Sequence, residues 1–443
     1  MQTTKVINAF PGYEYVNGKN LYRGTDLGKG GYIISNPGIY TDVALLDVAS
    51  LHPSSIIAMN CFGEYTQHFN DLLNARIAIK HGDFDTAKKM MNGRLEPYLD
   101  DESTAKDLAQ ALKIAINSCY GLTAANFDNP FRDIRNKNNI VALRGALFMK
   151  TLQDEVEKRG FKIVAIKTDS IKIADATEEI VDFCMSFANQ YSYTFEFEAF
   201  YDRICQINDA DYVARYKSLD GCESRFNYIP GDNKKHPEEW TVTGKRFAVP
   251  YVFKTLFSKD PITMDDMRET FSVKSALYLD MNEKLPDVSE YEKEREKLFK
   301  KINNPARLDE NMDAECERIE ELSKRIAEGH DYKFIGRVGE FCPVKPGMGG
   351  GLLMREQNGK YNAAAGTTGY RWLEAETLLA KGNEDYIDRS YYQKLVDDAV
   401  DAISQYGDFE WFTSDDLYIP EQELDDLPPW EDGVEETTAF DVR

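Results

Sequence analysis

The sequence predicts an α+β fold in which helices cover one face of an antiparallel sheet. Short runs of β-branched and apolar residues, bounded by polar turn residues, indicate strands, and longer segments with apolar residues at helical spacing indicate helices. The two kinds of segment alternate along the chain, and no internal repeat with a period of about 20–50 residues is present. A chain of 443 residues with 42% apolar and 29% charged residues is long enough to bury a large core and to divide into several substructures.

In the first half of the chain, each predicted element has a local signal. A buried strand ends near Asp47, and Pro53 suits the first turn of the helix that follows it. Gly160 is expected to end a helix, and a polar Thr-Asp-Ser triplet between two apolar runs predicts a β-hairpin with Asp169 at its tip. In chain order we expect a strand at 42–48 and then two helices, at 64–81 and 103–120, that form a hairpin through 82–102. The first helix has apolar Leu72, Leu73, Ile77 and Ile79, and the second has apolar Leu108, Leu112 and Ile116 and is capped by Asp101 or Ser103. The later expected elements are a helix at 137–159, the β-hairpin at 161–175, a helix at 177–190, and strands at 193–200, 203–207 and 211–217.

The second half of the chain is more charged and richer in turn residues. Residues 218–240 are polar and predict a surface loop, and the chain is expected to turn helical from about residue 250. The later predicted elements are two highly charged, solvated helices at 287–303 and 307–328, a glycine-rich β region at 332–372, and a last helix at 390–405.

The net charge of −23, taken alone, argues against nucleic-acid binding, but the charge is unevenly distributed. The segment 408–442 is strongly acidic and contains no basic residue, and a second acidic excess lies in 282–329. Between Arg132 and Lys172 the balance reverses, with basic residues at 132, 135, 137, 144, 150, 158, 159, 162, 167 and 172. An acidic exterior with a basic lining is compatible with nucleic-acid binding in a cleft.

The sequence also indicates a compartment. Seven scattered cysteines without C-x-x-C spacing argue against a disulfide framework or a zinc site and favour a reducing environment. No run of about 18 apolar residues is present, and Met1–Asn8 does not resemble a secretory leader. We therefore expect a protein of the cytoplasm, bacterial or of an infected host cell, without membrane association.

Two carboxylates and a group of cations are the candidate chemical groups. Asp47 and Asp169, both at strand ends, are suited to Mg²⁺, which takes one or two carboxylates together with substrate phosphates. The alternative is that Asp47 only ends a strand and Asp169 only makes an Asx turn. Lys113, Asn117 and Tyr120 share one helix face, where a cation can bind a triphosphate and an aromatic ring can contact a base pair or a sugar. Arg76 and Lys80, one turn apart on the preceding helix, either point to the same phosphates or form a solvated face.

Three motifs carry these residues. The first is Leu46-Asp47-Val48-Ala49-Ser50-Leu51-His52-Pro53-Ser54, the second is Lys113-x3-Asn117-Ser118-x-Tyr120-Gly121, and the third is Ile166-Lys167-Thr168-Asp169-Ser170. In this order and spacing the three motifs resemble motifs A, B and C of the family B (α-like) DNA polymerases, with phage-type sequences the most similar. The similarity covers residues 30–250.

The resemblance implies a right-hand polymerase architecture with an antiparallel-sheet palm, helical-hairpin fingers and a mostly helical thumb. Its domains would be a pre-palm segment and first palm part (1–62), fingers (63–120), palm (121–250), thumb with C-terminal insertions (251–407) and an acidic tail (408–443). The implied activity is DNA-templated addition of dNMP to a primer 3′-OH, with primer-template DNA and dNTPs as partners and two Mg²⁺ ions, or Mn²⁺, as cofactors.

The resemblance also assigns roles to residues. Asp47 and Asp169 would be catalytic and would bind metal together with the Val48 carbonyl. The nucleotide would be bound by Ser50, Leu51, His52, Arg76, Lys80, Lys113, Asn117 and Tyr120. DNA would be contacted by Gly30, Gly31, Tyr32, Gly121, Arg215, Tyr216 and Lys217.

The chain departs from the family pattern at two motif positions. Lys167 and His52 stand where the family has an aspartate and the tyrosine that excludes ribose, which puts sugar selectivity in question. Only about 40 residues precede the first predicted strand, so we expect no proofreading exonuclease in this chain, and a separate exonuclease chain or a sliding clamp would then be a partner. The acidic tail is expected either to be a solvated segment or to dock on such a partner through Leu424, Leu427 and Trp430.

Two functions follow from these residues. One is the DNA polymerase described above. The other is a catalytically weak or inactive polymerase-like subunit that binds DNA in a replication complex, which Lys167 and His52 favour and the intact Asp47, Asp169 and Lys113 oppose. A reverse transcriptase is not indicated, because the third motif lacks a Y-x-D-D turn.

Overall fold

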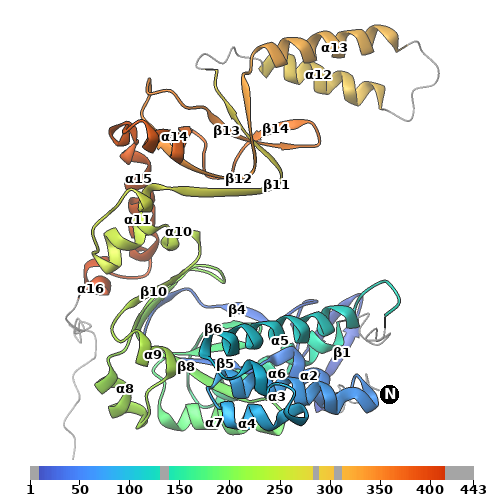
Figure 1. The fold of residues 1–443 in the computed structure, drawn as a ribbon, viewed down its shortest axis with the longest axis vertical. Coiled ribbons are helices and arrows are strands. Elements are labelled where there is room, and N and C mark those ends of the chain that lie inside the picture. Colours follow the sequence, from blue (N-terminus) through green and yellow to red (C-terminus); the bar gives the residue numbers. More distant parts are fainter. Residues whose placement is uncertain (1–8, 130–138, 283–288, 304–311, 415–443) are drawn as a thin grey trace, which may run out of the picture.

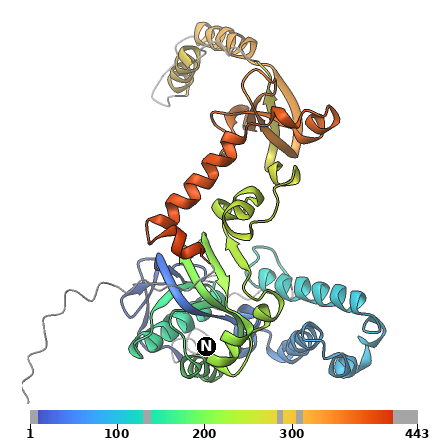
Figure 2. The same cartoon turned by 90° about the vertical axis from the view of Figure 1, so that its left-hand side faces the viewer.

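The computed structural model describes residues 9–129, 139–282, 289–303 and 312–414. The molecule is elongated, with a lower body around a seven-stranded sheet and an upper body around a five-stranded sheet (Figure 1). The helix α15 (Arg389–Ser404) runs from the upper body to the lower one, beside the chain segment that leads upward (Figure 2). None of the described helices is long and apolar enough to cross a membrane.

The lower body contains most of the elements. Its strands are β1 (Tyr13–Val16), β2 (Lys19–Tyr22), β3 (Thr25–Asp26), β4 (Ile33–Ser35), β5 (Gly38–Val48), β6 (Ile163–Lys167), β7 (Ser170–Ile173), β8 (Phe195–Gln206), β9 (Tyr212–Tyr216) and β10 (Trp240–Thr243). Its helices are α2 (Leu51–Ala58), α3 (Thr66–Lys80), α4 (Phe84–Lys89), α5 (Glu102–Thr123), α6 (Ile140–Lys158), α7 (Glu178–Gln190), α8 (Leu219–Phe226) and α9 (Gly231–Lys235).

The seven-stranded sheet has the order β10-β9-β8-β5-β7-β6-β4, and every neighbouring pair is antiparallel. The predicted strand at 42–48 is confirmed as the central β5, and the predicted hairpin is confirmed as β6 and β7. In β5, Ala44, Leu46 and Val48 point to a large core shared with α2, α6 and α7. Their neighbours Val43 and Leu45 belong to a smaller cluster on the opposite face. The predicted α+β sheet with helices on one face is therefore confirmed.

The two helices α3 and α5 confirm the predicted helical hairpin. They pack against each other through a separate small core that includes Ala75 and Ile79 of the first helix and Leu112 of the second. Asp101 caps α5 by accepting hydrogen bonds from the backbone N–H groups of Ser103 and Thr104, as predicted. The connection contains the short helix α4, which the sequence did not suggest.

Two local predictions about 193–240 are wrong. The two strands expected at 193–200 and 203–207 are one continuous strand, β8, which follows β5 past an irregularity in register between Leu45 and Leu46. The loop expected at 218–240 contains α8 and α9. Asn233, which is completely buried, holds this segment to the sheet by hydrogen bonds to the Phe200 N–H and carbonyl groups, both at 2.8 Å. A polar residue with that role is easily taken for a loop residue.

The prediction that the chain turns helical from about residue 250 is only partly correct, because a long strand follows the first short helices. Only short helices, α10 (Lys245–Ala248) and α11 (Pro250–Phe253), precede the long strand β11 (Glu269–Asp280). This strand is central to a sheet of order β14-β13-β11-β12-β15. Its core-facing residues Phe271, Val273, Leu277 and Leu279 occupy alternate positions, so the strand period is present in the sequence and the expectation of a helix is wrong here. The other strands are β12 (Tyr332–Val344), β13 (Leu352–Gln357), β14 (Lys360–Ala363) and β15 (Arg371–Glu374), and they confirm the predicted β region.

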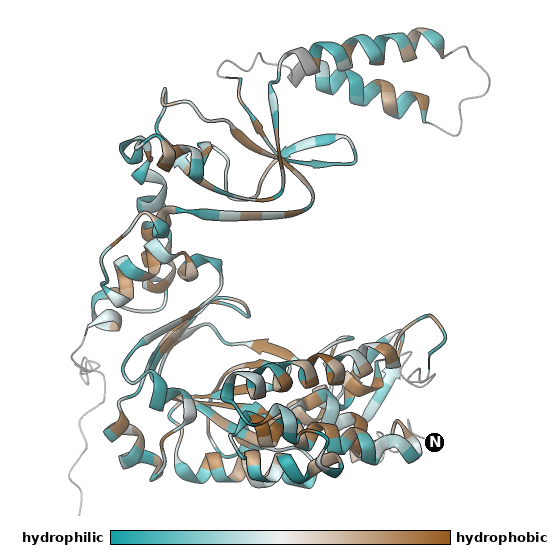
Figure 3. Ribbon diagram, viewed as in Figure 1, coloured by the Kyte–Doolittle hydropathy of each residue, from teal (hydrophilic) through white to brown (hydrophobic). Residues whose placement is uncertain are grey.

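The charged helical pair is confirmed as α12 (Ser289–Ile302) and α13 (Asp313–Glu328), which project from the far end of the upper body and are largely hydrophilic (Figure 3). The remaining helices are α14 (Ala375–Ala380), α15, and α16 (Phe409–Thr413). The buried Arg203 of β8 fixes α16 to the lower sheet, because its guanidinium donates to the carbonyls of Trp411 and Phe412 at 3.1 and 3.0 Å. The rest of the predicted acidic tail, from residue 415, and the basic residues at 132, 135 and 137 lie outside the described residues.

Candidate active site

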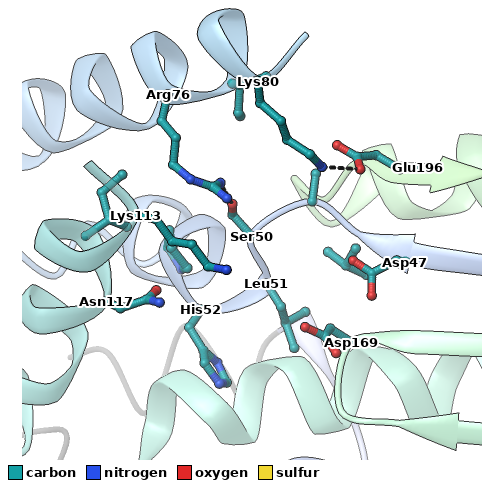
Figure 4. A pocket seen from close by; sticks show the side chains of 15 residues that line it. Asp47, Ser50, Leu51, His52, Arg76, Lys80, Lys113, Asn117, Asp169 and Glu196 are labelled. Carbon is teal, nitrogen blue, oxygen red and sulfur yellow. Dashed lines mark hydrogen bonds and ion pairs between the residues drawn. The ribbon is translucent and has the colours of Figure 1, made fainter. Parts of the chain in front are cut away.

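The two candidate carboxylates come from adjacent strands of the lower sheet. Asp47 is near the end of β5, opposite Ser170 of β7, and Asp169 lies in the turn between β6 and β7. The Val48 N–H donates to the Asp169 carbonyl at 2.8 Å, which ties the strand end to the turn. Both side chains line one pocket of about 370 Å³ between the sheet and the helices α2, α3 and α5 (Figure 4).

The turn that carries Asp169 depends on a close approach from the N-terminal segment. Thr168 has a positive φ of 61°, and its N–H donates to the Tyr32 carbonyl at 2.9 Å. A Cβ atom on Gly31 would lie 2.3 Å from the Thr168 Oγ1 atom, so a side chain at residue 31 does not fit. The Tyr32 hydroxyl donates to Gln153 at 2.7 Å, and its ring is buried. The Gly31-Tyr32 segment thus supports the turn, the Tyr32 ring packs inside the protein, and a DNA contact by this segment stays a prediction.

The carboxylates repel one another in a buried setting. Burial, followed by the charges of Asp169, Glu198 and Glu196, raises the pKa of Asp47 to about 7. Burial also raises the pKa of Asp169. The negative charge that accumulates here favours a cation, and the sequence analysis missed Glu196 and Glu198 as contributors. Their signal is the alternation Phe195-Glu196-Phe197-Glu198, typical of a strand with one acidic face.

The donor set at this position fits a hard divalent cation. Asp47 and Asp169 offer two carboxylates, and Val48 lines the same pocket. Within the described ranges, no group of three or more His, Cys, Asp or Glu residues has the arrangement of a complete metal site. Mg²⁺ commonly needs only one or two carboxylates when substrate phosphates supply further oxygens, so an all-protein cage is not required.

The opposite wall of the pocket carries the cations. Arg76 and Lys80 extend from α3 and Lys113 from α5, and all three line the pocket (Figure 4). The Arg76 guanidinium donates to the Ser50 hydroxyl at 3.4 Å. Lys80 is turned toward the sheet, where it forms an ion pair with Glu196 at 2.7 Å. The structure thus brings together the cations that the sequence placed on separate helices.

The first turn of α2 forms the floor between the two walls. Ser50 precedes this helix with a positive φ of 61°, and Leu51 and His52 follow it into the pocket. The buried Leu51 packs on α6 at Gly145, where an added Cβ atom would lie 2.7 Å from a Leu51 methyl group. Gly145 therefore allows the close approach of α6 that supports the floor.

His52 and Tyr120 form one stacked pair. Their ring centroids are 4.5 Å apart and the planes are inclined by 16°. The Tyr120 hydroxyl donates to the Asn139 side chain at 3.0 Å, and Asn139 donates to the Lys29 carbonyl at 2.8 Å. Burial lowers the pKa of His52, which favours the neutral form of its ring. Asn117 lines the pocket one helical turn before Tyr120.

The other predicted DNA contacts lie outside this pocket. Gly121 follows Tyr120 on α5 and has open space around it. Tyr216 is buried against Tyr201, and its contact with DNA stays a prediction. Lys217 forms ion pairs with Asp42 at 2.7 Å and Asp202 at 3.5 Å. Arg215 donates to the Glu238 carbonyl at 3.1 Å. These residues hold β9 to its surroundings, and a DNA contact by Arg215 or Lys217 stays a prediction.

Comparison with known proteins gives a limited similarity. No family model matches the chain. Over 171 residues the chain is 30% identical to DNA polymerase II of Escherichia coli (strain K12), which covers 34% of this chain and 21% of that protein. Among solved structures, the family B DNA polymerase from the hyperthermophilic archaeon Pyrobaculum calidifontis is similar with a TM-score of 0.39 and 11% identity, over 91% of this chain and 50% of that one. The chain thus spans about a fifth of the curated relative, and the sequence similarity supports a polymerase-like fold.

Proposed function

We propose that this chain is a DNA-templated DNA polymerase that adds dNMP to a primer 3′-OH and releases pyrophosphate. The observation that carries the proposal is the common pocket. Asp47 and Asp169 line one wall, and Arg76 and Lys113 line the other, although Asp47, Lys113 and Asp169 come from three separate sequence motifs and Arg76 lies outside all of them. Phosphoryl transfer needs this combination, since charge develops on the transferred group and on the leaving group.

Each wall has its own part in the proposed reaction. Asp47, Asp169 and the Val48 carbonyl would hold two Mg²⁺ ions, or Mn²⁺, which supply charge neutralisation and a more acidic primer hydroxyl. Lys113 and Arg76 bind the triphosphate, with Lys80 as a third cation once it leaves Glu196. The backbone of Ser50 and Leu51 contacts the same phosphates. The negatively charged triphosphate would thus lie between the carboxylates, which hold the metal ions, and the lysine and arginine side chains.

The remaining residues position the sugar, the base and the DNA. His52, supported by Tyr120, contacts the sugar, and Asn117 borders the nucleotide. In this proposal α3–α5 are the fingers, the seven-stranded sheet is the palm, and the upper body with its five-stranded sheet takes the place of the thumb. Primer-template DNA lies across the palm, near Gly30, Gly31, Gly121, Arg215 and Lys217.

Two observations favour a second function. The Lys80–Glu196 ion pair withdraws a cation from the phosphate wall, and Lys167 replaces a carboxylate in the third motif. Both features fit a polymerase-like subunit that binds DNA without extending it. The raised pKa of Asp47 argues for catalysis, because an inactive descendant has no need to retain buried, mutually repelling carboxylates.

Primer extension separates the two functions. The purified chain is mixed with a primer-template duplex, the four dNTPs and Mg²⁺, and extension is followed on a sequencing gel while DNA binding is measured by fluorescence anisotropy. The polymerase predicts template-dependent extension that EDTA abolishes. Binding of the duplex without any extension, with Mg²⁺ or Mn²⁺, would support the non-catalytic subunit.

A further inference from the structure

A second pocket, which we call the outer fingers pocket, continues from the candidate active site into the helical hairpin. It measures about 550 Å³ and is bordered by α3, α4 and α5. Arg76, Lys80 and Lys113 line both this pocket and the inner one. The three cations are therefore a shared wall between two spaces. A polyanion bound at this wall has room to move in either direction.

The outer fingers pocket has further polar groups along α5. Lys106, Gln110 and Lys113 follow at spacings of four and three residues, so they lie on one face of the helix. The small residues Ala105 and Ala109 lie between them and leave the groove open. Lys106 is about 10 Å farther from the catalytic carboxylates than Lys113 along the helix axis, at a rise of about 1.5 Å per residue.

The charge balance differs between the two pockets. In the inner pocket the three shared cations face three carboxylates, Asp47, Asp169 and Glu196, whereas the outer pocket adds Lys106 to these cations and contains the single carboxylate Glu102. Glu102 pairs with Lys106 at 2.8 Å, and both side chains are about three-quarters exposed at 74% and 75%. An exposed pair of this kind is weak, so Lys106 is available to an incoming anion. An anion that leaves the inner pocket would thus move away from carboxylates toward cations.

We propose that the outer fingers pocket is a pyrophosphate subsite, through which the leaving group departs past Lys113, Gln110 and Lys106. This inference rests on the proposed function for the source of the pyrophosphate. Pyrophosphate is small, highly charged and rich in acceptor oxygens, which matches the lysines, the arginine and the amide that line a groove completed by Ile79, Phe84 and small residues. Lys106 acts here as a binding residue for the product and takes no part in the bond-forming step.

Direct binding tests the subsite without any polymerase activity. Inorganic pyrophosphate is titrated into the full chain by calorimetry, in low salt and without divalent metal. Lys106→Gln should weaken binding about two- to fivefold, the range expected for one exposed charge. Lys106→Glu should weaken it further, on the order of tenfold, since it adds repulsion. Lys88→Gln is the matched control, because Lys88 is also an ion-paired lysine of the fingers hairpin but does not line the pocket, and it should change nothing.

Extension assays complete the test. Added pyrophosphate should inhibit primer extension by the Lys106 variants less than it inhibits the wild type. If the wild type does not extend primers but Lys106 affects pyrophosphate binding, the proposed function fails and the subsite stands. If Lys106→Glu binds pyrophosphate as the wild type does while Lys113→Gln does not, the subsite is overturned and the polyanion stays in the inner pocket.

Discussion

The two walls of the candidate active site are built differently. The carboxylate wall belongs to a sheet: Asp47 and Asp169 are fixed by a backbone hydrogen bond of 2.8 Å and are more than half buried. The cation wall belongs to helix surfaces, where the Lys80 side chain is 48% exposed and Lys113 is also exposed. The sheet holds the carboxylates in one geometry, where burial and mutual repulsion destabilise their charged forms. The helices leave the long cationic side chains exposed to solvent, where their charge is stabilised by water and they can change conformation.

This difference indicates what each wall can tolerate. A group that must hold its place within a fraction of an ångström needs a rigid scaffold, whereas a long side chain that follows a mobile polyanion needs the opposite. The ion pair between Lys80 and Glu196 joins the two walls within the described structure. Substitutions in the carboxylate wall should therefore have larger effects than substitutions in the cation wall.

The largest effect is expected at the carboxylates themselves. Asp169→Asn and Asp47→Asn keep the shape of the side chain but remove a metal-binding charge, so each should lower the rate of primer extension by about 1,000-fold or more. DNA affinity should stay within about twofold of the wild type, as the carboxylates do not attract phosphate. Asp175→Asn is the control, because Asp175 is an exposed residue just after β7. Near wild-type extension by Asp169→Asn with Mg²⁺ would disprove the metal assignment.

A smaller loss is expected from the support of the Asp169 turn. Gly31→Ala forces a Cβ atom against Thr168, so the turn must shift, and a displacement of about 1 Å can cost on the order of 100-fold in rate. Gly30→Ala is the matched control, because it adds the same methyl group to the neighbouring glycine, where a Cβ atom meets nothing within 4 Å. Extension rates and thermal unfolding of both variants are measured together. Equal rates for the two would show that the turn does not depend on this contact.

The cation wall should show graded effects. Lys113→Ala is expected to raise the KM for dNTP and to slow incorporation, by about tenfold in kcat/KM, because it removes a phosphate contact that strengthens in the transition state. Lys80→Ala should have a smaller effect, since Glu196 already holds this side chain in the free protein. Single-nucleotide incorporation with varied dNTP measures both. A loss of DNA affinity alone in Lys113→Ala would instead place Lys113 in the duplex groove.

Much of the lower body could be predicted because its signals are local. The Thr-Asp-Ser turn, the cap at Asp101 and the apolar spacing of α3 and α5 depend on neighbours in sequence. The Gly31–Thr168 contact and the position of Glu196 beside Lys80 could not be predicted, since they depend on which strands become neighbours. In the upper body, the core-facing residues of β11 do alternate, but the polar Ser275 occupies one of these positions between Val273 and Leu277 and weakens the pattern.

The smallest predicted effect is a gain in stability when the proposed catalytic residue Asp47 is replaced by Asn. Asp47 has a folded-state pKa of about 7, against 3.8 for the ordinary carboxyl, mainly because of burial and then the charge of Asp169. Between these two values the folded protein binds more protons than the unfolded chain, so the free energy of unfolding falls as the pH rises from about 4 to about 7. Below about pH 4 the contribution of the protonated Asp47 carboxyl to the free energy of unfolding is fully present, and above about pH 7 this contribution is lost.

Asp47→Asn should therefore be more stable than the wild type at pH 8, by about 1–3 kcal/mol after allowance for the partial exposure of the carboxylate, and nearly equal to it at pH 4.5. Urea unfolding in EDTA at the two pH values measures the difference, with Asp175→Asn expected to show none. Adding Mg²⁺ should raise the melting temperature of the wild type more than that of Asp47→Asn, because only the wild type keeps both carboxylates for the ion. If the wild type is the more stable protein at pH 8 without metal, burial and repulsion do not destabilise the ionised carboxylates. The energetic difference that we infer between the carboxylate wall and the cation wall is then wrong.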